Sequence, residues 1–218
     1  DITFTPPLNF NGSENFTVTV SDGDLSDFQV ITVTVNAVND VPVATTSLSS
    51  STAEGTSVII QLSGSDVDGD NLTYSLDTDA ANGSVVIDGT LATYTPADFF
   101  NGLDQFSFEV SDGLLTDTAV VTLTVSSVND APVLANIGDV IFDEDGTGFI
   151  SVSGSDVDAD DLTFSISSGT DITASQVGSD ITFTPPLNFN GSENFTVTVS
   201  DGDLSDFQVI TVTVNAVN

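Results

Sequence analysis

The 218-residue chain contains no Lys, Arg or His, and its 33 Asp and Glu residues give it a formal net charge of -33 at pH 7. Binding to nucleic acids depends on Lys and Arg side chains that displace counterions from phosphates, so this composition excludes it. Direct attraction to anionic lipid headgroups is excluded for the same reason. The partners that this charge favours are cations.

Cysteine is also absent, which removes disulfides and thiolate metal ligands as sources of stability. A Ser-His-Asp triad, a Cys-His pair and a Lys base are impossible without these residue types. Trp is missing and Tyr occurs only twice, which leaves little for an aromatic sugar-binding platform. Paired carboxylates of the glycosidase kind are not excluded by count. We nevertheless expect that the chain is not an enzyme.

Hydrophobic residues make up 39% of the chain and recur at every second position. Examples are Val58, Ile60 and Leu62, then Phe106, Phe108 and Val110, then Ile210, Val212 and Val214. Clusters such as Asn82-Gly83 and Asp112-Gly113 separate these segments, and they predict turns that need positive φ or an Asx hydrogen bond. Roughly seven short strands in about 90 residues favour an antiparallel β-sandwich.

Residues 1–39 recur letter for letter as residues 180–218. We therefore expect the second half of one repeat, residues 1–39, followed by two complete repeats, residues 40–129 and 130–218. The boundaries fall at Asn39/Asp40 and Asn129/Asp130. One small β domain per repeat in a tandem array suits a structure that spans distance.

The half repeat has strand-like stretches at residues 2–5, 16–21 and 29–36. These stretches cannot close a sandwich alone, because their apolar faces would lie open and their edges would be unpaired. We expect material that matches residues 130–179 to complete this half. It would come from earlier in a longer chain or from a neighbouring copy in a head-to-tail filament.

Acidic residues return at the same places in each repeat. They are Glu54 and Glu144, the runs Asp66–Asp70 and Asp156–Asp160, the Asp of Ser-Asp-Gly at Asp22, Asp112 and Asp201, and the Asn-Asp pairs at the two junctions. Asp and Asn are common turn residues, so loop structure alone accounts for part of this pattern. Calcium, however, takes about six to eight oxygen ligands, and converging carboxylates in a chain without Lys or Arg need a metal to compensate their charge.

The order of these motifs resembles a known family. The pattern Val-Asn-Asp-x-Pro, followed by SDVDGDNLTYSL and then FEVSDGLLTDTAVVTLTVSSVND, is similar to the cadherin-like tandem repeats of giant bacterial surface proteins and, more distantly, to cadherin ectodomains. The resemblance covers both complete repeats and the half repeat. It implies an all-β fold of tandem immunoglobulin- or cadherin-like Greek-key β-sandwiches joined end to end, in a secreted or cell-surface protein.

The resemblance also implies that Ca²⁺ is held between consecutive repeats by ligands from both sides. At the first junction the implied ligands are Asn39, Asp40, Asp66, Asp68 and Asp112. At the second junction they are Glu54, Asn129, Asp130, Asp156, Asp158 and Asp201. The chain has Ala37 and Ser127 where the cadherin linker begins with Asp, and it has Asn11 and Asn101 near the place of a second cadherin Glu. Fewer carboxylates predict weaker sites or fewer ions.

Three functions are compatible with this reading. The first is a calcium-stiffened stalk in a bacterial adhesin or biofilm matrix protein. The second is a subunit of a self-assembling head-to-tail extracellular filament or surface layer. The third is a carbohydrate- or cell-binding module. The expected partners are neighbouring repeats of the same or an adjacent chain.

Overall fold

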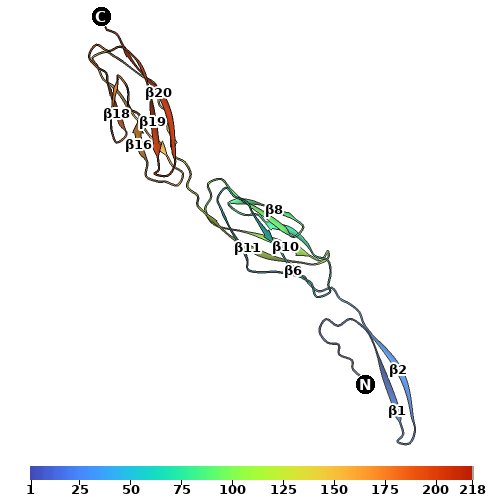
Figure 1. The fold of residues 1–218 in the computed structure, drawn as a ribbon. Coiled ribbons are helices and arrows are strands. Elements are labelled where there is room, and N and C mark those ends of the chain that lie inside the picture. The colour runs from blue at the N-terminus through green and yellow to red at the C-terminus, as the bar shows by residue number, and fades with distance from the viewer. Residues whose placement is uncertain (218) are drawn as a thin grey trace. The chain divides into compact units, whose positions relative to one another are not determined.

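The computed structural model describes residues 1–217, and every regular element in this range is a β-strand (Figure 1). The chain divides into two compact units, residues 1–127 and the residues from 128 on. The first unit holds a β-hairpin and one complete β-sandwich, and the second unit holds another β-sandwich. Within residues 1–217 there is no helix long and apolar enough to cross a membrane. The prediction of an all-β fold is confirmed.

The first complete sandwich has one sheet of order β4-β11-β10-β7, a second of order β5-β9-β8, and a short pair β3-β6. β3 and β4 are two parts of one strand that pairs first with β6 and then, in parallel, with β11. β5 and β6 likewise divide the next strand, so the domain follows the expected seven-strand path. The bounds are β3 (Val43–Ala44), β4 (Leu48–Ala53), β5 (Val58–Gln61), β6 (Gly64–Ser65), β7 (Thr73–Thr78), β8 (Gly83–Asp88), β9 (Leu91–Pro96), β10 (Gly102–Ser111) and β11 (Thr116–Ser126).

The second complete sandwich repeats this arrangement, with sheets β13-β20-β19-β16 and β14-β18-β17 and the pair β12-β15. Its strands are β12 (Val133–Leu134), β13 (Val140–Asp143), β14 (Gly148–Ser151), β15 (Gly154–Ser155), β16 (Thr163–Ile166), β17 (Thr173–Val177), β18 (Asp180–Thr184), β19 (Gly191–Ser200) and β20 (Ser205–Asn215).

The period-two pattern forms the core in both domains. Phe106, Phe108 and Val110 alternate along β10, and each is at most 1% exposed. Since successive strand residues point to opposite faces, this alternation buries one face of the sheet against the other sheet. Each fully buried side chain of this kind contributes roughly 1.5–3 kcal/mol to folding. Burial of the alternating residues therefore accounts for the sandwich without disulfides.

The predicted turn at Asn82-Gly83 is present at residues 81–82, but Gly83 does not supply the positive φ that was one of its two expected features. Gly83 begins β8. A Cβ at this position would lie 2.5 Å from the Tyr94 ring and 2.6 Å from the Thr95 carbonyl oxygen. Gly83 is therefore required by close packing of β8 on β9.

The N-terminal hairpin joins β1 (Gly12–Ser21) to β2 (Ser26–Val35), with the same register as its identical copy in β19 and β20. The prediction of a strand at residues 2–5 is wrong, although the same residues form most of β18 in the second copy. β18 pairs with β14 and β17, which both lie within residues 130–179. No strand of the described chain pairs with residues 2–5.

One acidic side chain holds a loop in each complete domain, Asp104 in the first and Glu193 in the second, and we call this arrangement the acid clasp. In the first domain Asp104, 8% exposed, accepts hydrogen bonds from Ala81 N (3.2 Å), Asn82 N (2.9 Å) and Tyr94 Oη (3.0 Å). Burial, and then the hydrogen bond to Asp104 and its charge, raise the pKa of Tyr94. The sequence analysis did not single out Asp104.

Replacing the clasp acid tests its contribution to stability. We expect D104A to lower the free energy of unfolding of residues 40–127 by about 3 kcal/mol, because buried backbone and tyrosine donors lose their acceptor. The chain has no Trp, and its two tyrosines, Tyr74 and Tyr94, both lie in this domain. Tyrosine fluorescence during urea unfolding therefore reports on this domain alone. D88A, at an exposed position at the end of β8, is the control. Equal effects of the two variants would contradict the role of the clasp.

Candidate metal centre

The linker ahead of the first complete sandwich is tied to two of its loops. Asn39 Nδ2 donates hydrogen bonds to Asp112 Oδ2 (2.7 Å) and to the Asp40 carbonyl oxygen (3.1 Å). The Asp40 backbone N–H donates to Asp68 Oδ2 (2.8 Å). The linker residues are therefore fixed on the loop that follows β6 and on the β10–β11 turn.

The loop after β6 wraps around one carboxylate. Asp66 Oδ1 accepts hydrogen bonds from the backbone N–H groups of Asp68 (2.8 Å) and Gly69 (3.1 Å). The fourth residue of each acidic run, Asp66–Asp70 and Asp156–Asp160, has a left-handed backbone conformation, with φ of 81° at Gly69 and 64° at Ala159. The strain of a left-handed Ala marks Ala159 as a position that its surroundings hold in place.

This geometry directs three carboxylates toward one point. Asp66, Asp68 and Asp70 each offer an oxygen, and the three atoms lie within 4.8 Å of one another. Asp66 Oδ2 is buried and accepts no hydrogen bond within the described chain. A buried carboxylate oxygen without a donor is costly, and the two neighbouring negative charges increase that cost.

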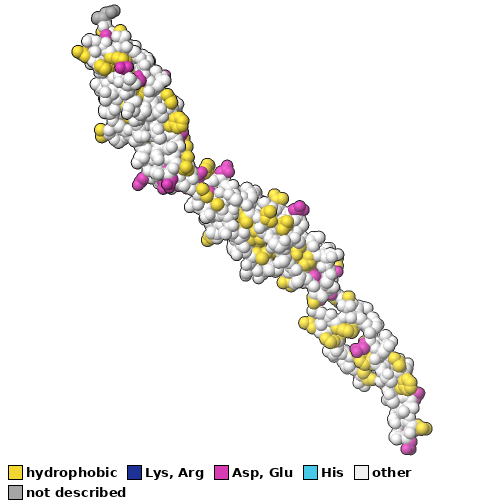
Figure 2. Space-filling view, in the orientation of Figure 1, with side chains coloured by type: hydrophobic (Ala, Val, Ile, Leu, Met, Phe, Trp, Pro, Cys, Tyr) yellow, Lys and Arg dark blue, Asp and Glu magenta, His cyan; other side chains and the backbone are white. Residues whose placement is uncertain are grey.

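The second complete domain repeats the arrangement residue by residue. Asn129 Nδ2 donates to Asp201 Oδ2 (3.0 Å), and Asp130 N donates to Asp158 Oδ2 (2.8 Å). Oxygens of Asp156, Asp158 and Asp160 lie within 4.8 Å of one another, and Asp156 Oδ2 is again buried without a hydrogen bond within residues 1–217. Two domains of different sequence thus leave the equivalent Asp oxygen, Oδ2 of Asp66 or of Asp156, without a hydrogen-bond donor. Acidic side chains gather at the ends of this domain on the face that Figure 2 shows.

The Asp of each Ser-Asp-Gly turn has a lowered pKa. Backbone donation from Leu115, and then the amide of Asn39, lower the pKa of Asp112. Backbone donation from Leu204 and the Asn129 amide do the same for Asp201, and they outweigh its desolvation. These two side chains are therefore ionised at neutral pH.

Asp160 shows the opposite shift. Desolvation, and then the negative charges of Asp156 and Asp158, raise the pKa of Asp160. No positive side chain exists in the chain to reverse this effect. The three-carboxylate cluster therefore carries an electrostatic cost that a cation would remove.

Glu54 and Glu144 lie at the other end of their domains, beside the last strand. The Glu54 backbone N–H donates to the Ser126 carbonyl oxygen (2.9 Å), and the side chain is 9% exposed. The Glu144 backbone N–H donates to the Asn215 carbonyl oxygen (2.9 Å), and its Oε1 accepts from Val217 N (2.7 Å). Each Glu therefore stands where the chain leaves the sandwich.

Within each unit the structure brings together the residues that the sequence analysis selected from that unit's linker and loops. They are Asn39, Asp40, Asp66, Asp68 and Asp112 in the first unit, and Asn129, Asp130, Asp156, Asp158 and Asp201 in the second. Asp70 and Asp160 were seen in the acidic runs but were not chosen as ligands, although both belong to the clusters. The sequence signal for them was their spacing, because Asp70 follows Asp68, and Asp160 follows Asp158, at the same two-residue interval as the chosen ligands. That any of these residues binds metal stays a prediction.

The donor set fits a hard cation. Every candidate atom is a carboxylate, amide or carbonyl oxygen, and no thiolate or imidazole is present. Oxygen-only sets suit calcium, magnesium or manganese, and the flexible coordination of calcium suits loops of this kind best. The buried Asp66 Oδ2 and Asp156 Oδ2 are the atoms that such an ion would satisfy.

Fold and clusters together define tandem Ig-like β-sandwiches with acidic groups that resemble cadherin-type calcium sites. The chain belongs to the Bacterial Ig domain family, whose profile matches residues 39–124 and 129–215. Domains of this family are typical of surface and secreted proteins. The resemblance inferred from the motifs is confirmed.

Solved structures support the fold. The PcdhgB3 EC1-4 structure is 15% identical, with a TM-score of 0.61 over 94% of this chain and 58% of that chain. Mouse protocadherin-24 EC1-3 is 14% identical, with a TM-score of 0.54 over 94% of this chain and 80% of that chain. A match to an endo-fucoidan hydrolase of glycoside hydrolase family 107 is 21% identical and spans 98% of this chain and 35% of that chain, but its TM-score of 0.39 is too low to support the fold. No curated protein matches the chain.

The lowered pKa of Asp112 predicts acid sensitivity in the absence of metal. Since the folded pKa lies below the ordinary value of 3.8, the stability that ionised Asp112 gives is present above that value and is lost as pH falls through the lowered pKa. We expect D112N, which keeps the oxygen but not the charge, to flatten the decline in stability between about pH 5 and about pH 2 in chelator. Urea unfolding followed by tyrosine fluorescence measures this slope. D88N removes one charge elsewhere in the domain, and an equal flattening by D88N would refute the assignment.

Proposed function

We propose that this chain is a calcium-stiffened structural repeat, the stalk segment of a secreted or surface-attached bacterial adhesin or matrix protein. Its role in this proposal is mechanical and not catalytic. One observation carries the proposal. In two successive domains, one buried Asp oxygen without a donor lies in a three-carboxylate cluster whose loop is hydrogen-bonded to the linker.

The linker contacts explain why a cation would act on stiffness. Asp40 donates its backbone N–H to Asp68, and Asp130 donates to Asp158. In the metal-free state these bonds hold the linker on a cluster of negative charges that repel one another. A bound calcium would convert that repulsion into attraction while Asp66 and Asp156 supply their unsatisfied oxygens.

The resemblance to cadherins adds Glu54 to the ligands proposed at Asn129 and Asp130. Support comes from its position at the end of its own sandwich, beside Ser126, three residues before Asn129 in the sequence. Glu144 occupies the same place in the second domain. A ligand supplied at the exit of each domain would let every repeat contribute to the site of the next, so stiffness would extend along an array of any length.

Stalk function also agrees with the surface. A formal charge of -33 raises the local concentration of divalent cations around the chain. Sites of extracellular modules bind calcium with dissociation constants on the order of 10⁻⁴ to 10⁻³ M. Such sites fill in calcium-rich extracellular fluids and empty at cytosolic calcium levels, which would restrict stiffening to the outside of the cell.

Calcium should stabilise the first complete domain through Asp66 and Asp68. At ten times its dissociation constant, one ion adds about 1.4 kcal/mol to the free energy of unfolding. We expect tyrosine fluorescence to show this gain in wild-type protein and to show none in D66N/D68N. The matched control D88N/D98N removes the same charge at two exposed positions of the same domain and should keep the gain. A calcium effect that survives in D66N/D68N would rule out this site.

Calcium should also extend the array at the second linker. We expect the maximum dimension from solution scattering to increase and its distribution to narrow when calcium replaces chelator, and we expect E54Q to reduce this response. Native mass spectrometry should count fewer bound ions in D156N/D158N, with both sandwiches still folded by circular dichroism. Equal dimensions in calcium and in chelator would reject stiffening, even if ions are bound.

A further inference from the structure

Residues 1–35 and 180–214 have identical sequences but differ in the residues that pack against them. Large apolar side chains that are fully buried in residues 180–214 are exposed in residues 1–35. The exposed fractions in the first and second copy are 62% at Ile2 and 0% at Ile181, 38% at Phe4 and 0% at Phe183, 70% at Val20 and 0% at Val199, and 37% at Ile31 and 1% at Ile210. We call this apolar surface of residues 1–35 the open face.

The opposite side of the hairpin is an internal control. Phe28 is 68% exposed and its copy Phe207 is 65% exposed, while Val30 and Val209 are 52% and 53% exposed. These side chains face solvent in both copies. The difference at the open face therefore comes from the residues packed against it in the second copy, and residues 130–179 supply them.

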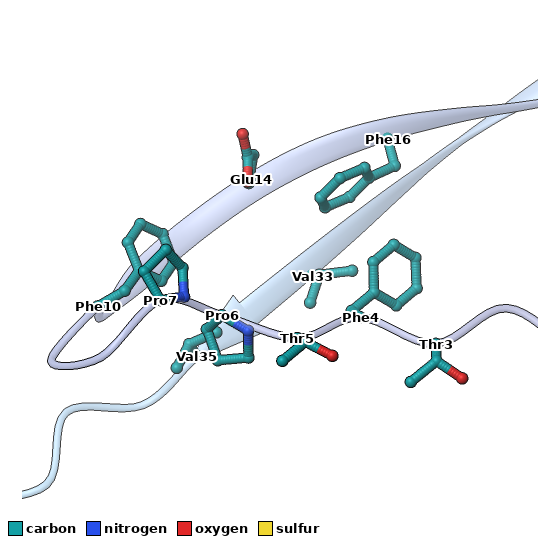
Figure 3. Close-up of a pocket in the computed structure, with 10 residues that line it drawn as sticks. All are labelled: Thr3, Phe4, Thr5, Pro6, Pro7, Phe10, Glu14, Phe16, Val33 and Val35. Carbon is teal, nitrogen blue, oxygen red and sulfur yellow. The ribbon is translucent and has the colours of Figure 1, made fainter.

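The open face contains a groove of about 420 Å³ that has a specific occupant in the second copy. Figure 3 shows the side chains of Phe4 and Val33 close together in the groove, and the Phe4 and Phe16 rings lie 4.7 Å apart. In the second copy, Ile172 is 1% exposed and belongs to the same core cluster as Phe183, Phe195 and Val212, the copies of Phe4, Phe16 and Val33. A Cβ at Gly169 would lie 2.8 Å from the Phe195 ring and 2.9 Å from Glu193 Oε2, the copies of the groove residues Phe16 and Glu14. The loop of residues 169–172 therefore covers this surface in the second copy.

Glu14 lines the groove and corresponds to the acid of the second acid clasp, but no loop of the described chain binds it. In the second copy Glu193 accepts backbone hydrogen bonds from Thr170, from Asp171 (3.3 Å) and from Ile172 (2.9 Å). These bonds outweigh desolvation and lower the pKa of Glu193. Its counterpart Glu14 is exposed and accepts no hydrogen bond within the described chain.

Strand edges are open at the same places. β19 and β20 pair with β16 and β13, and β18 pairs with β14 and β17. All four of these partners lie within residues 130–179. β1 and β2 pair only with each other, and residues 1–5 remain outside any strand. Main-chain pairing and apolar burial are therefore both available to the same incoming segment.

We propose that the open face of residues 1–35 is a docking site for the front half of a repeat of this same type, a segment of the kind formed by residues 130–179 that is not already closed by its own back half. The loop equivalent to residues 169–172 enters the groove, and its N–H groups bind Glu14. Residues 1–5 then become a strand, as residues 180–184 do in β18.

An intact second copy of this chain is not the occupant. Its residues 130–179 are already covered by residues 180–214, and replacing that hairpin by the identical hairpin of another molecule uncovers as much apolar surface as it buries. Such an exchange has no net gain from burial. The occupant must be a front half that has no hairpin of its own.

Hydrogen exchange tests the proposal, because the two copies give peptic fragments of identical mass. In the free chain, fragments from within residues 12–35 and 191–214 should show two isotope envelopes, a fast one from β1–β2 and a slow one from β19–β20. Excess synthetic peptide of residues 130–179 should slow the fast envelope by at least about tenfold, until it merges with the slow one.

Two matched variants separate docking from nonspecific binding, and each changes the mass of the first-copy fragments so that they are followed alone. V30D alters a side chain that stays exposed in both copies and should leave protection by the peptide intact. V20D places a charge on the open face and should abolish it. The proposal is overturned if the peptide gives no protection, or if it protects V20D as well as V30D. Protection that appears without peptide, rises with chain concentration and accompanies a dimer in light scattering would identify a second copy as the occupant and overturn it equally.

Discussion

Negative charge without any basic side chain is the constraint on which the rest of this structure depends. With 33 acidic residues and no Lys, Arg or His, each carboxylate has only water, neutral donors or a metal ion as partners. Many accept hydrogen bonds from backbone N–H groups, as Asp112 and Asp201 do in the turns between the last two strands. Asp66 Oδ2 and Asp156 Oδ2 are buried and have none of these within the described chain. A cation would satisfy these two oxygens, and this is the basis of the proposed response to calcium.

The same constraint determines how acidic side chains within the sandwich and at its edge are held. Asp104 and Glu193 hold loops through several backbone N–H groups at once, where an ion pair would serve in a chain of mixed charge. Hydrogen bonds to an ionised acceptor are stronger than neutral ones, and no second charge has to be desolvated. The clasp therefore fixes the loop between the third and fourth strands of the sandwich without a counter-charge. It also gives the two halves of each repeat a polar contact in addition to their apolar one.

The sequence predicted structural features that depend on neighbouring residues in the chain. It did not predict features in which a residue contacts a partner far along the chain. Alternation at Phe106, Phe108 and Val110 predicted the buried face, because the strand period is a local property. The linker and loop acids were found because they recur in each repeat. The role of Asp104 was missed since its donors, Ala81 and Asn82, precede it by more than 20 residues and use only their backbones. Gly83 was misread because the side chain that requires a glycine there belongs to Tyr94 on the neighbouring strand.

The two identical copies separate local from tertiary causes more sharply than any substitution could. Residues 12–35 form the same hairpin in the same register with or without residues 130–179, because the turn after β1 is closed within the segment by Asp22 and its backbone donors. Residues 1–5 have the sequence of β18 and are not a strand, because both neighbours of β18 come from the front half of the repeat. The repeat is thus built from a hairpin that forms by itself and a front half that converts the preceding segment into a strand. The proposed cation binding and the closure of the sandwich would consequently be separate events: the first would depend on charge at the ends of a domain, and the second depends on apolar surface between its halves.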